Sequence, residues 1–486
     1  MKTLSRSSQV SLALGITIAL LDPAFSTAVR AQVIRTKDQR ERTVMDRRIA
    51  AERTGQEQSE YYNGSQVVPG SVLVKIATPE GVVGTDVLVL ADADNSSTTR
   101  LGATGITIVR SYTQDTTTLI TKLRKLPNVL YAEPNYILRA DESVVIPRFE
   151  DQWGLQNTGQ KIDGIDGTEG ITGADIGAVP AWTFSTGSKS IVVGIVDTGV
   201  DYTHPDLAAN MWSAPADFTV TIEGQTIACA KGSHGFNAIT KRCDPMDDNN
   251  HGTHVAGIIG ANGTGSGSGI MGVNQTTNMM ALKFLGNDGV GKTSDAINAI
   301  EFAIQVKQRF GAAANVRILN NSWGGGGKSQ ALLDEINRVA VNDILFVAAA
   351  GNNSVDNDAS PHYPGNYAAP NIITVAATNN RDLLDQSFSN WGKNSVHLGA
   401  PGSRILSTII SSGQSYAFFS GTSMATPFVS GVAALVLSRC AIDTQALKKQ
   451  ILDNVAPNVS LNNVTITGGR LDVNKSLHAC VPTSSP

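Results

Sequence analysis

Short apolar runs alternate with amphipathic runs in the second half of the chain. Residues 191–196, 316–321 and 372–377 are apolar almost throughout and predict strands, whereas residues 294–310 and 330–341 repeat apolar side chains at helical spacing. Two further strands are predicted over residues 278–284 and 344–350. Such strands, separated by helices, are typical of a parallel sheet with helices on both faces. Ligands bind at the carboxyl ends of these strands, so we expect chemistry in the residues that follow them.

An earlier segment has a different pattern. Strand-like runs over residues 67–76, 106–112 and 129–137, with a helical run over 117–126, predict a separate, small α+β unit. The segment before it is rich in Lys and Arg and has little apolar periodicity, so residues 32–66 are interpreted as a linker.

The N-terminus has the features of an export signal. Lys2 and Arg6 precede the apolar run 10–21, and small residues follow as far as Ala31. This run is shorter than the roughly 20 residues that a membrane-spanning helix needs. We therefore predict a signal peptide over residues 1–31 and a secreted, extracellular protein, with an uncleaved anchor as the alternative.

Composition excludes some classes of partner and leaves others open. The chain has 486 residues, a net charge of −4 and 41% hydrophobic residues, which argues for a globular protein without the basic face of a nucleic-acid binder. We expect no nucleic-acid partner, no membrane contact once the signal is removed, and a monomer. Sequons such as the one at Asn352 permit glycosylation, although we expect Asn352 to be unmodified.

Four cysteines in an exported chain predict two disulfide bonds. Three pairings are possible, and neighbours in sequence are favoured, which gives Cys229–Cys243 and Cys440–Cys480. A zinc site is the competing use of these residues. It is disfavoured because the sequence has no Cys-x-x-Cys spacing.

Three polar residues far apart in sequence make a consistent set. Asp197 directly follows a predicted strand, while His251 and Ser423 each begin a predicted buried helix. Singly, each has an ordinary role as a helix cap, a turn residue or a buried histidine. His254 gives a histidine pair, but no third zinc ligand is apparent. Together the three supply a nucleophile, a base and an orienting carboxylate, in an order that excludes an α/β-hydrolase.

The motifs around these residues resemble those of a known family. VDTGVDYTHPDL, HGTHVAG and GTSMATP closely resemble the three catalytic motifs of the subtilisin-like serine proteases (subtilases, peptidase family S8), and the resemblance covers roughly residues 151–478. It implies a three-layer α/β catalytic domain with a mainly parallel central sheet over residues 151–486. It also implies a serine endopeptidase that forms an acyl-enzyme, in which Asp197 supports His251, His251 is the base and then the acid, and Ser423 is the nucleophile.

The resemblance extends to the substrate cleft. Asn352, in FVAAAGNNS, matches the family's oxyanion-stabilising asparagine, and two segments resemble those that hold a peptide as an added strand. Trp323 replaces a commoner leucine and could line a pocket, and His362 stands where many relatives have a small residue at the base of a specificity pocket. The substrate-binding residues implied are Gly289, Val290, Gly291, Ser322, Trp323 and Gly324.

Metal binding and a covering domain are also implied. Asp206 matches a family Ca²⁺ ligand, with a solvated loop carboxylate as the equal alternative. Asp244, Asp247 and Asp248 could form a second oxygen-rich site. Residues 67–145 resemble the inhibitory propeptide of many subtilases, which would make the chain a self-processing zymogen cut within residues 140–151. The partners implied are polypeptide substrates and the chain's own propeptide. The alternatives are an independent binding module for that unit and, for the whole chain, a non-catalytic binding protein or an esterase.

Overall fold

The computed structural model describes residues 60–77, 96–102, 104–139, 149–162, 169–263, 269–410 and 416–480. These all belong to one compact unit, Gln58–Pro486. The predicted signal peptide, most of the predicted linker and the predicted cleavage region before residue 149 lie outside the described residues. Within the described ranges, no helix combines the length and the apolar character needed to cross a bilayer.

A nine-stranded sheet forms the centre of the larger part of the structure. Its neighbouring strands are parallel, except that β18 pairs with β19 in the antiparallel sense. The prediction of a mainly parallel sheet is therefore confirmed. The strand order is β18 (Ala456–Pro457), β19 (Gly469–Arg470), β15 (Leu398–Pro401), β14 (Ile372–Thr378), β13 (Leu345–Ala349), β12 (Val316–Asn321), β6 (Gly187–Asp197), β10 (Thr276–Lys283) and β9 (Gly235–Asn237).

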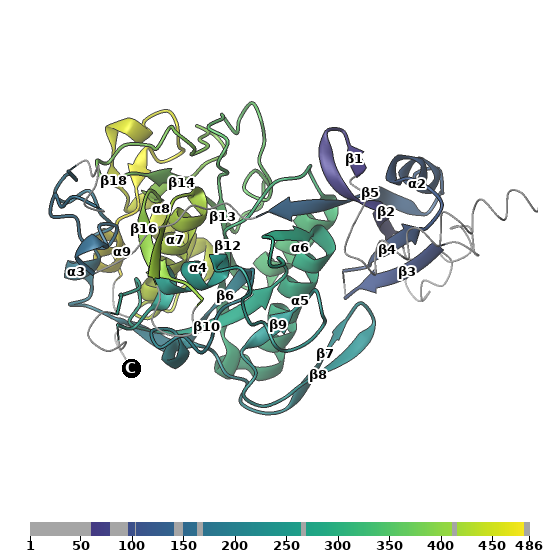
Figure 1. The fold of residues 1–486 in the computed structure, drawn as a ribbon, viewed down its shortest axis with the longest axis horizontal. Coiled ribbons are helices and arrows are strands. Elements are labelled where there is room, and N and C mark those ends of the chain that lie inside the picture. The colour runs from purple at the N-terminus through teal and green to yellow at the C-terminus, as the bar shows by residue number, and fades with distance from the viewer. Residues whose placement is uncertain are drawn as a thin grey trace, which may run out of the picture. The chain divides into compact units, whose positions relative to one another are not determined.

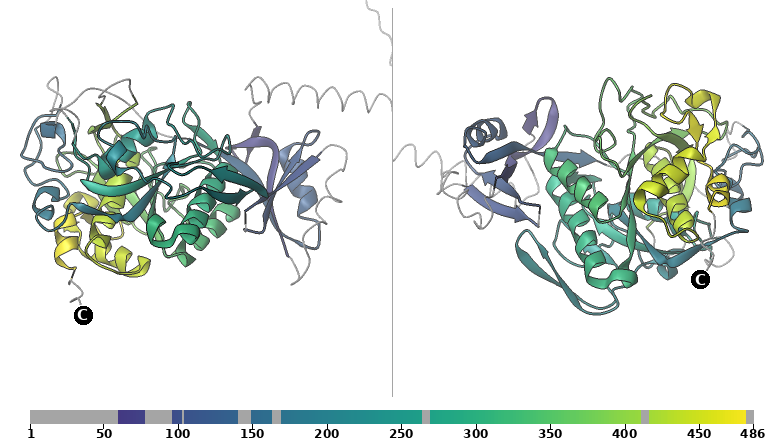
Figure 2. Two further views of the ribbon diagram at one scale, coloured as in Figure 1. Left: turned by 90° about the horizontal axis from the view of Figure 1, so that it is seen from below. Right: turned by 180° about the vertical axis from the view of Figure 1, so that it is seen from behind.

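Helices cover both faces of this sheet, as Figures 1 and 2 show. Helices α4 (His251–Gly260) and α7 (Thr422–Leu437) pack on one face, and α5 (Thr293–Phe310) and α6 (Gln330–Val341) pack on the other. Strand β6 illustrates the reason, because alternate side chains of a strand point to opposite faces. Val193 and Ile195 belong to the hydrophobic core with α4 and α7, while Val192 belongs to the core with α5 and α6. The short helices are α3 (Ala178–Ala181), α8 (Thr444–Asp453) and α9 (Val473–His478), with 3-10 turns at Phe149–Asp151, Ala208–Asn210, Gly311–Ala314 and Val459–Leu461.

The N-terminal described segment is an antiparallel sheet with one helix. Strands β3 (Ser96–Leu101), β4 (Ile106–Ser111), β2 (Ser65–Ile76) and β5 (Val129–Arg139) pair in that order, with β1 (Glu60–Tyr62) on β2, and α2 (Thr116–Leu123) packs on the sheet. We call residues 60–139 the N-terminal unit. It begins within the predicted linker, because the carboxylate of Glu60 accepts hydrogen bonds from the backbone of Gly70 and Thr116.

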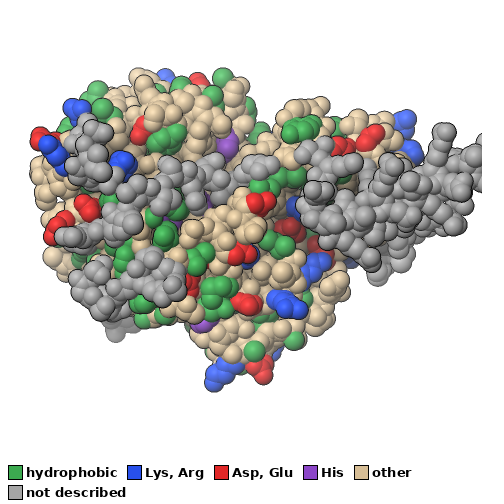
Figure 3. Space-filling model, viewed as in Figure 1, with side chains coloured by type: hydrophobic (Ala, Val, Ile, Leu, Met, Phe, Trp, Pro, Cys, Tyr) green, Lys and Arg blue, Asp and Glu red, His purple; other side chains and the backbone are tan. Residues whose placement is uncertain are grey.

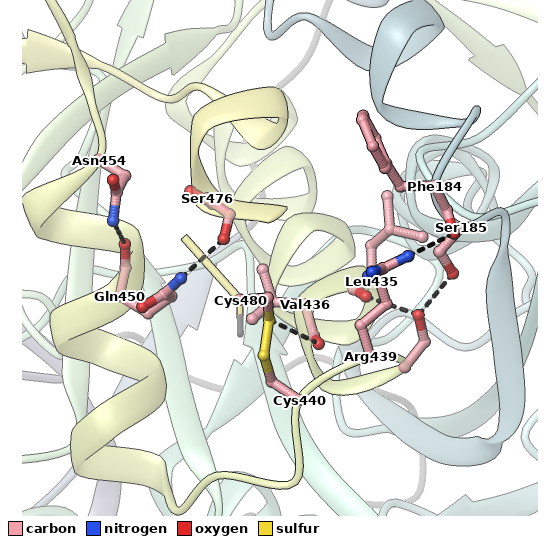
Figure 4. The surroundings of a disulfide bond; sticks show 11 residues. Phe184, Ser185, Leu435, Val436, Arg439, Cys440, Gln450, Asn454, Ser476 and Cys480 are labelled. Carbon is pink, nitrogen blue, oxygen red and sulfur yellow. Dashed lines mark hydrogen bonds between the residues drawn. A yellow bond between two sulfur atoms is a disulfide. The ribbon is translucent and has the colours of Figure 1, made fainter. Parts of the chain in front are cut away.

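Both predicted disulfide bonds are present. Cys229–Cys243 joins β8 (Gln225–Cys229) to the loop before α4, with the Cα atoms 5.5 Å apart. Cys440–Cys480 joins the segments that follow α7 and α9, with the Cα atoms 5.9 Å apart (Figure 4). The hairpins β7–β8 (Phe218–Ile222, Gln225–Cys229) and β16–β17 (Ile405–Thr408, Tyr416–Phe419) and the short β11 (Val290–Lys292) complete the described elements. On the face drawn in Figure 3, acidic and basic side chains are interspersed rather than segregated.

Candidate active site

Asp197 and His251 are joined by a direct hydrogen bond. His251 Nδ1 lies 2.7 Å from Asp197 Oδ1, and both side chains are fully buried. Because a carboxylate can only accept, the proton of the neutral imidazole is on Nδ1, and Nε2 carries the lone pair. The same carboxylate oxygen accepts the backbone N–H of Thr198 at 2.7 Å. The pair therefore has the geometry of an imidazole base whose orientation is fixed by a carboxylate.

A polar network fixes the backbone around this pair. The Thr198 hydroxyl donates to Asp247 at 2.8 Å and accepts the Gly252 N–H at 2.9 Å. The other carboxylate oxygen of Asp247 accepts both the N–H and the hydroxyl of Thr253. A side chain at Gly252 would place its Cβ 2.0 Å from the carbonyl oxygen of Gly199, so only glycine allows α4 to approach β6 this closely.

A buried lysine adds a further restraint. Lys283 pairs with Asp197 in the register of β10 and β6. Its ammonium donates to the carbonyl oxygens of Thr198 and Leu285 and to the carboxylate of Asp248. It thus ties the residue after Asp197 to the chain that leads into β11.

Ser423 is the second residue of α7. Its hydroxyl donates to the carbonyl oxygen of Ser322 at 2.9 Å, and the Ser322 hydroxyl donates back to the carbonyl oxygen of Ser423 at 2.8 Å. Helix α7 packs directly against α4, which begins at His251. In this structure the Ser423 hydroxyl is therefore directed at Ser322.

Asn352 lies just after β13 and is oriented by the residue before Ser423. Its side-chain oxygen accepts the N–H and the hydroxyl of Thr422, each at 2.8 Å. With the oxygen fixed, the amide nitrogen of Asn352 is the group left to donate. Asp197 ends β6, and Ser322 and Asn352 follow the adjacent strands β12 and β13, so the carboxyl edge of the sheet gathers them, as predicted.

The predicted peptide-binding segment 289–291 is itself paired with a strand. Val290, Gly291 and Lys292 pair in the antiparallel sense with Arg139, Leu138 and Ile137 at the end of β5. A Cβ at Gly291 would lie 2.6 Å from the carbonyl oxygen of Phe284, which explains the glycine. This segment thus pairs through its backbone with an extended segment of the same chain.

Two other predicted residues take different places. The indole of Trp323 is fully buried in the core against Phe284. It is therefore a core side chain here, and the prediction that it could line a pocket finds no support. His254, expected to be structural, donates to the carbonyl oxygen of Ala417 and stacks on Phe419, and burial lowers its pKa to about 3.

The described acidic residues offer few metal ligands. Asp206 is fully buried, and its Oδ2 accepts hydrogen bonds from the Ile270 N–H and the Tyr416 hydroxyl. The other three carboxylates have separate partners. Asp244 accepts a hydrogen bond from Tyr202, Asp247 accepts from threonine hydroxyls, and Asp248 accepts from Lys283, so they do not converge. Among the described residues no group of three His, Cys, Asp or Glu side chains could hold a metal ion. The second oxygen-rich site is therefore not formed by these three residues.

Comparison with known proteins identifies the family. The model of the subtilase family, peptidase family S8, matches residues 188–471. The chain belongs to the subtilase family. By this membership it is a subtilisin-like serine endopeptidase.

Curated relatives agree with this assignment. The chain is 33% identical to a thermophilic serine proteinase of Bacillus sp. strain AK1, over 73% of this chain and 74% of that protein. It is 35% identical to subtilisin-like protease 2 of Plasmodium falciparum over 52% of this chain, and 34% identical to an extracellular protease of Xanthomonas campestris over 70% of this chain. The chain spans only 17% and 57% of the lengths of these last two relatives.

Proposed function

We propose that this subtilase is a secreted endopeptidase that cleaves polypeptides through Asp197, His251 and Ser423 and is made as a self-processing zymogen. The observation that carries the proposal is the hydrogen bond between Asp197 and His251 at the end of β6, beside the helix that presents Ser423. Secretion is supported by the N-terminal sequence, by two disulfide bonds and by an extracellular relative.

Each residue has a defined task in this mechanism. His251 Nε2 takes the proton from the Ser423 hydroxyl as that oxygen attacks the peptide carbonyl. Asp197 keeps the second imidazole nitrogen protonated and stabilises the cation that forms. The oxyanion accepts hydrogen bonds from the Asn352 amide and the Ser423 backbone N–H. His251 then gives its proton to the departing amine, and water releases the acyl group by the same steps.

The N-terminal unit is the inhibitory propeptide in this proposal. Its last strand occupies the peptide-binding edge at β11, and its Glu133 carboxylate accepts the Ser329 hydroxyl and the N–H groups of Gln330 and Ala331 at the start of α6. Asn135 also exchanges hydrogen bonds with Ser294 at the start of α5. A unit held at these three places covers the cleft until it is cut away.

Self-processing is the experiment that tests the proposal. The full chain and its Ser423→Ala variant are expressed side by side and followed on a gel and by mass spectrometry. We expect the wild-type chain to shorten and the variant to stay full length. Identical patterns for the two chains would contradict self-cleavage, and failure of a fluorophosphonate probe to label Ser423 in the wild-type protein would contradict the proposed nucleophile.

We also propose a structural Ca²⁺ beside Asp206. The support is that the loop backbone comes close to this carboxylate, since a Cβ at Gly269 would lie 2.8 Å from Asp206 Oδ1. Other oxygen atoms would have to complete the site, because Ca²⁺ takes six to eight oxygen ligands. No catalytic step depends on this ion.

A further inference from the structure

The imidazole of His362 fills a narrow space between two glycines. A Cβ at Gly324 would lie 2.1 Å from His362 Nε2, and a Cβ at Gly351 would lie 2.9 Å from its Nδ1. The backbone of His362 is fixed by reciprocal hydrogen bonds with Asn366. Both glycines therefore leave room for this ring, and the hydrogen bonds with Asn366 fix the backbone that carries it.

The two glycines belong to the segments that hold the reacting groups. Gly324 is two residues after Ser322, whose carbonyl oxygen accepts the Ser423 hydroxyl. Gly351 directly precedes Asn352, and its N–H donates to the Thr422 hydroxyl. In the proposed mechanism the substrate carbonyl lies between Ser423 and Asn352, so the residue before the cleaved bond lies next to these two segments and to the wall that contains His362.

His362 offers one unused polar atom in that wall. Its Nε2 is buried and has no hydrogen-bond partner among the described residues. Burial lowers the pKa of His362 to about 4, and no charged side chain in the described part of the chain contributes to the shift. A buried polar atom without a partner is unfavourable, so a ligand that satisfies it gains affinity.

The chemistry of this wall selects among side chains. A carboxylate can accept a hydrogen bond from Nε2–H and, by favouring the imidazolium, can form a neutral ion pair. An ammonium or guanidinium group would be buried there without a counter-charge. An apolar side chain would leave Nε2 unsatisfied.

The chain's own sequence points to the same class of substrate. Strand β5 runs along the peptide-binding edge as far as Arg139, which pairs with Val290. In the sequence Arg139 is followed by Ala140, Asp141 and Glu142. The chain therefore carries two acidic residues shortly after Arg139, within the region where the zymogen is expected to be cut.

We propose that His362 makes this enzyme select peptides with an acidic residue, aspartate or glutamate, immediately before the cleaved bond. This inference rests on the proposed function, because it places the cleaved bond at Ser423. In it, His362 binds the side-chain carboxylate of the substrate and takes no part in bond breaking.

The test compares peptides that differ only at the residue before the cleaved bond. The residues compared are glutamate, glutamine, methionine and lysine. Their side chains are similar in length, so differences in cleavage report the charge and polarity of the side chain rather than its size. Enzyme produced from the full chain is first titrated with a fluorophosphonate probe at Ser423, so that each kcat/KM refers to active sites. We expect kcat/KM for glutamate to exceed that for each of the other three at least about tenfold, the size of one charge-assisted hydrogen bond.

Two variants assign the preference to His362. His362→Phe keeps a ring in the space but removes both nitrogens, and the ratio of glutamate to glutamine should fall to about one. His362→Gln keeps an N–H donor and should retain part of the preference, which guards against a folding defect in the first variant. If the probe labels Ser423 but the wild type shows no preference for glutamate, the inference about His362 fails while the proposed function stands. The same holds if the preference survives in His362→Phe. Absence of labelling would overturn the proposed function and this inference with it.

Discussion

The side-chain oxygen of Asn352 accepts two hydrogen bonds from Thr422, one from the backbone N–H and one from the hydroxyl, each 2.8 Å long. Thr422 is also the neighbour of Ser423, so the residue that orients the oxyanion donor is bonded to the proposed nucleophile. The hydroxyl of Thr422 in turn accepts the N–H of Gly351. One threonine therefore aligns the two groups that act on the same carbonyl in the proposed mechanism.

Replacing Thr422 by valine should lower kcat and leave KM nearly unchanged. The variant keeps the shape of the side chain but removes one of the two hydrogen bonds that fix Asn352, and we expect a loss of about tenfold in kcat. Asn352→Ala should lower kcat by a factor of about 10²–10³, a range established in subtilisin itself. Steady-state kinetics on one peptide gives both parameters.

Thr426→Val is the matched control for this prediction. Thr426 lies one turn further along α7, and its hydroxyl donates to the carbonyl oxygen of Thr422 without contacting Asn352. Its kcat should stay within a factor of two or three of the wild type, since only a backbone contact is lost. Equal kcat values for Thr422→Val and the control would show that Thr422 does not orient the amide.

Glu133 should contribute strongly to the stability of the uncut chain. Its buried carboxylate accepts three hydrogen bonds from Ser329, Gln330 and Ala331 at the start of α6, and these bonds join the N-terminal unit to the rest of the structure. Glu133→Gln replaces one acceptor by a donor that faces N–H groups, and we expect a loss of about 1–3 kcal/mol in the free energy of unfolding. Thermal unfolding in the Ser423→Ala background, which prevents cleavage, measures it.

The comparison for Glu133 is Asp115→Asn. Asp115 caps α2 within the N-terminal unit through the Thr118 N–H, at an exposed position, and asparagine caps nearly as well. Its effect on the melting temperature should be small. If Glu133→Gln melts at the same temperature as this control, the contact at α6 does not hold the unit in place.

Buried elements were the ones that the sequence predicted well. Helix α6 occupies the predicted residues 330–341, and β12 occupies the predicted residues 316–321, because their apolar side chains follow the period of one element and fill a core. Strand β3, with the sequence SSTTRL, was missed because its polar side chains carry no such pattern. Its backbone is placed by pairing with β4, which is a tertiary effect.

The same distinction holds within the active site. Three motifs led to Asp197, His251 and Ser423, since each motif joins a reactive residue to its local backbone. The role of Thr422 depends on a contact with a residue 70 positions away, and that of Lys283 on the register of two strands. Lys283 lies in a strand of apolar neighbours, and that break in the pattern was the one signal that could have found it.

Removal of calcium should lower the melting temperature if an ion binds beside Asp206. A ligand that binds only the folded state stabilises it in proportion to the logarithm of its concentration over Kd. The melting temperature of the Ser423→Ala chain is compared in millimolar Ca²⁺ and in a chelator. Asp206→Asn should melt lower in both, because Asp206 also binds Tyr416, and should show no difference between them. Equal melting temperatures of the parent chain in both conditions would remove the ion from the proposal.

Acid should destabilise the folded chain from about pH 6.5 downward, because three buried histidines must stay neutral. Burial lowers the pKa of His254 and His397 to about 3 and that of His362 to about 4. The unfolded chain binds protons at these residues near pH 6.5, whereas the folded chain does so only near pH 3 to 4. Their contribution is therefore complete above pH 6.5 and is lost as the pH falls toward 4. Each residue costs about 1.4 kcal/mol per pH unit within that window.

His397→Gln isolates one of these contributions. The Nδ1 of His397 accepts the Thr374 N–H at 3.0 Å, and a glutamine oxygen can accept the same hydrogen bond without titrating. In the Ser423→Ala background, the free energy of unfolding is measured by denaturant titration between pH 7 and pH 4. We expect the variant to lose less stability than the parent chain over this range, by up to about 1.4 kcal/mol for each pH unit below 6.5. An unchanged pH dependence would contradict the prediction, because it would mean that burial does not lower the pKa of His397 in the folded chain.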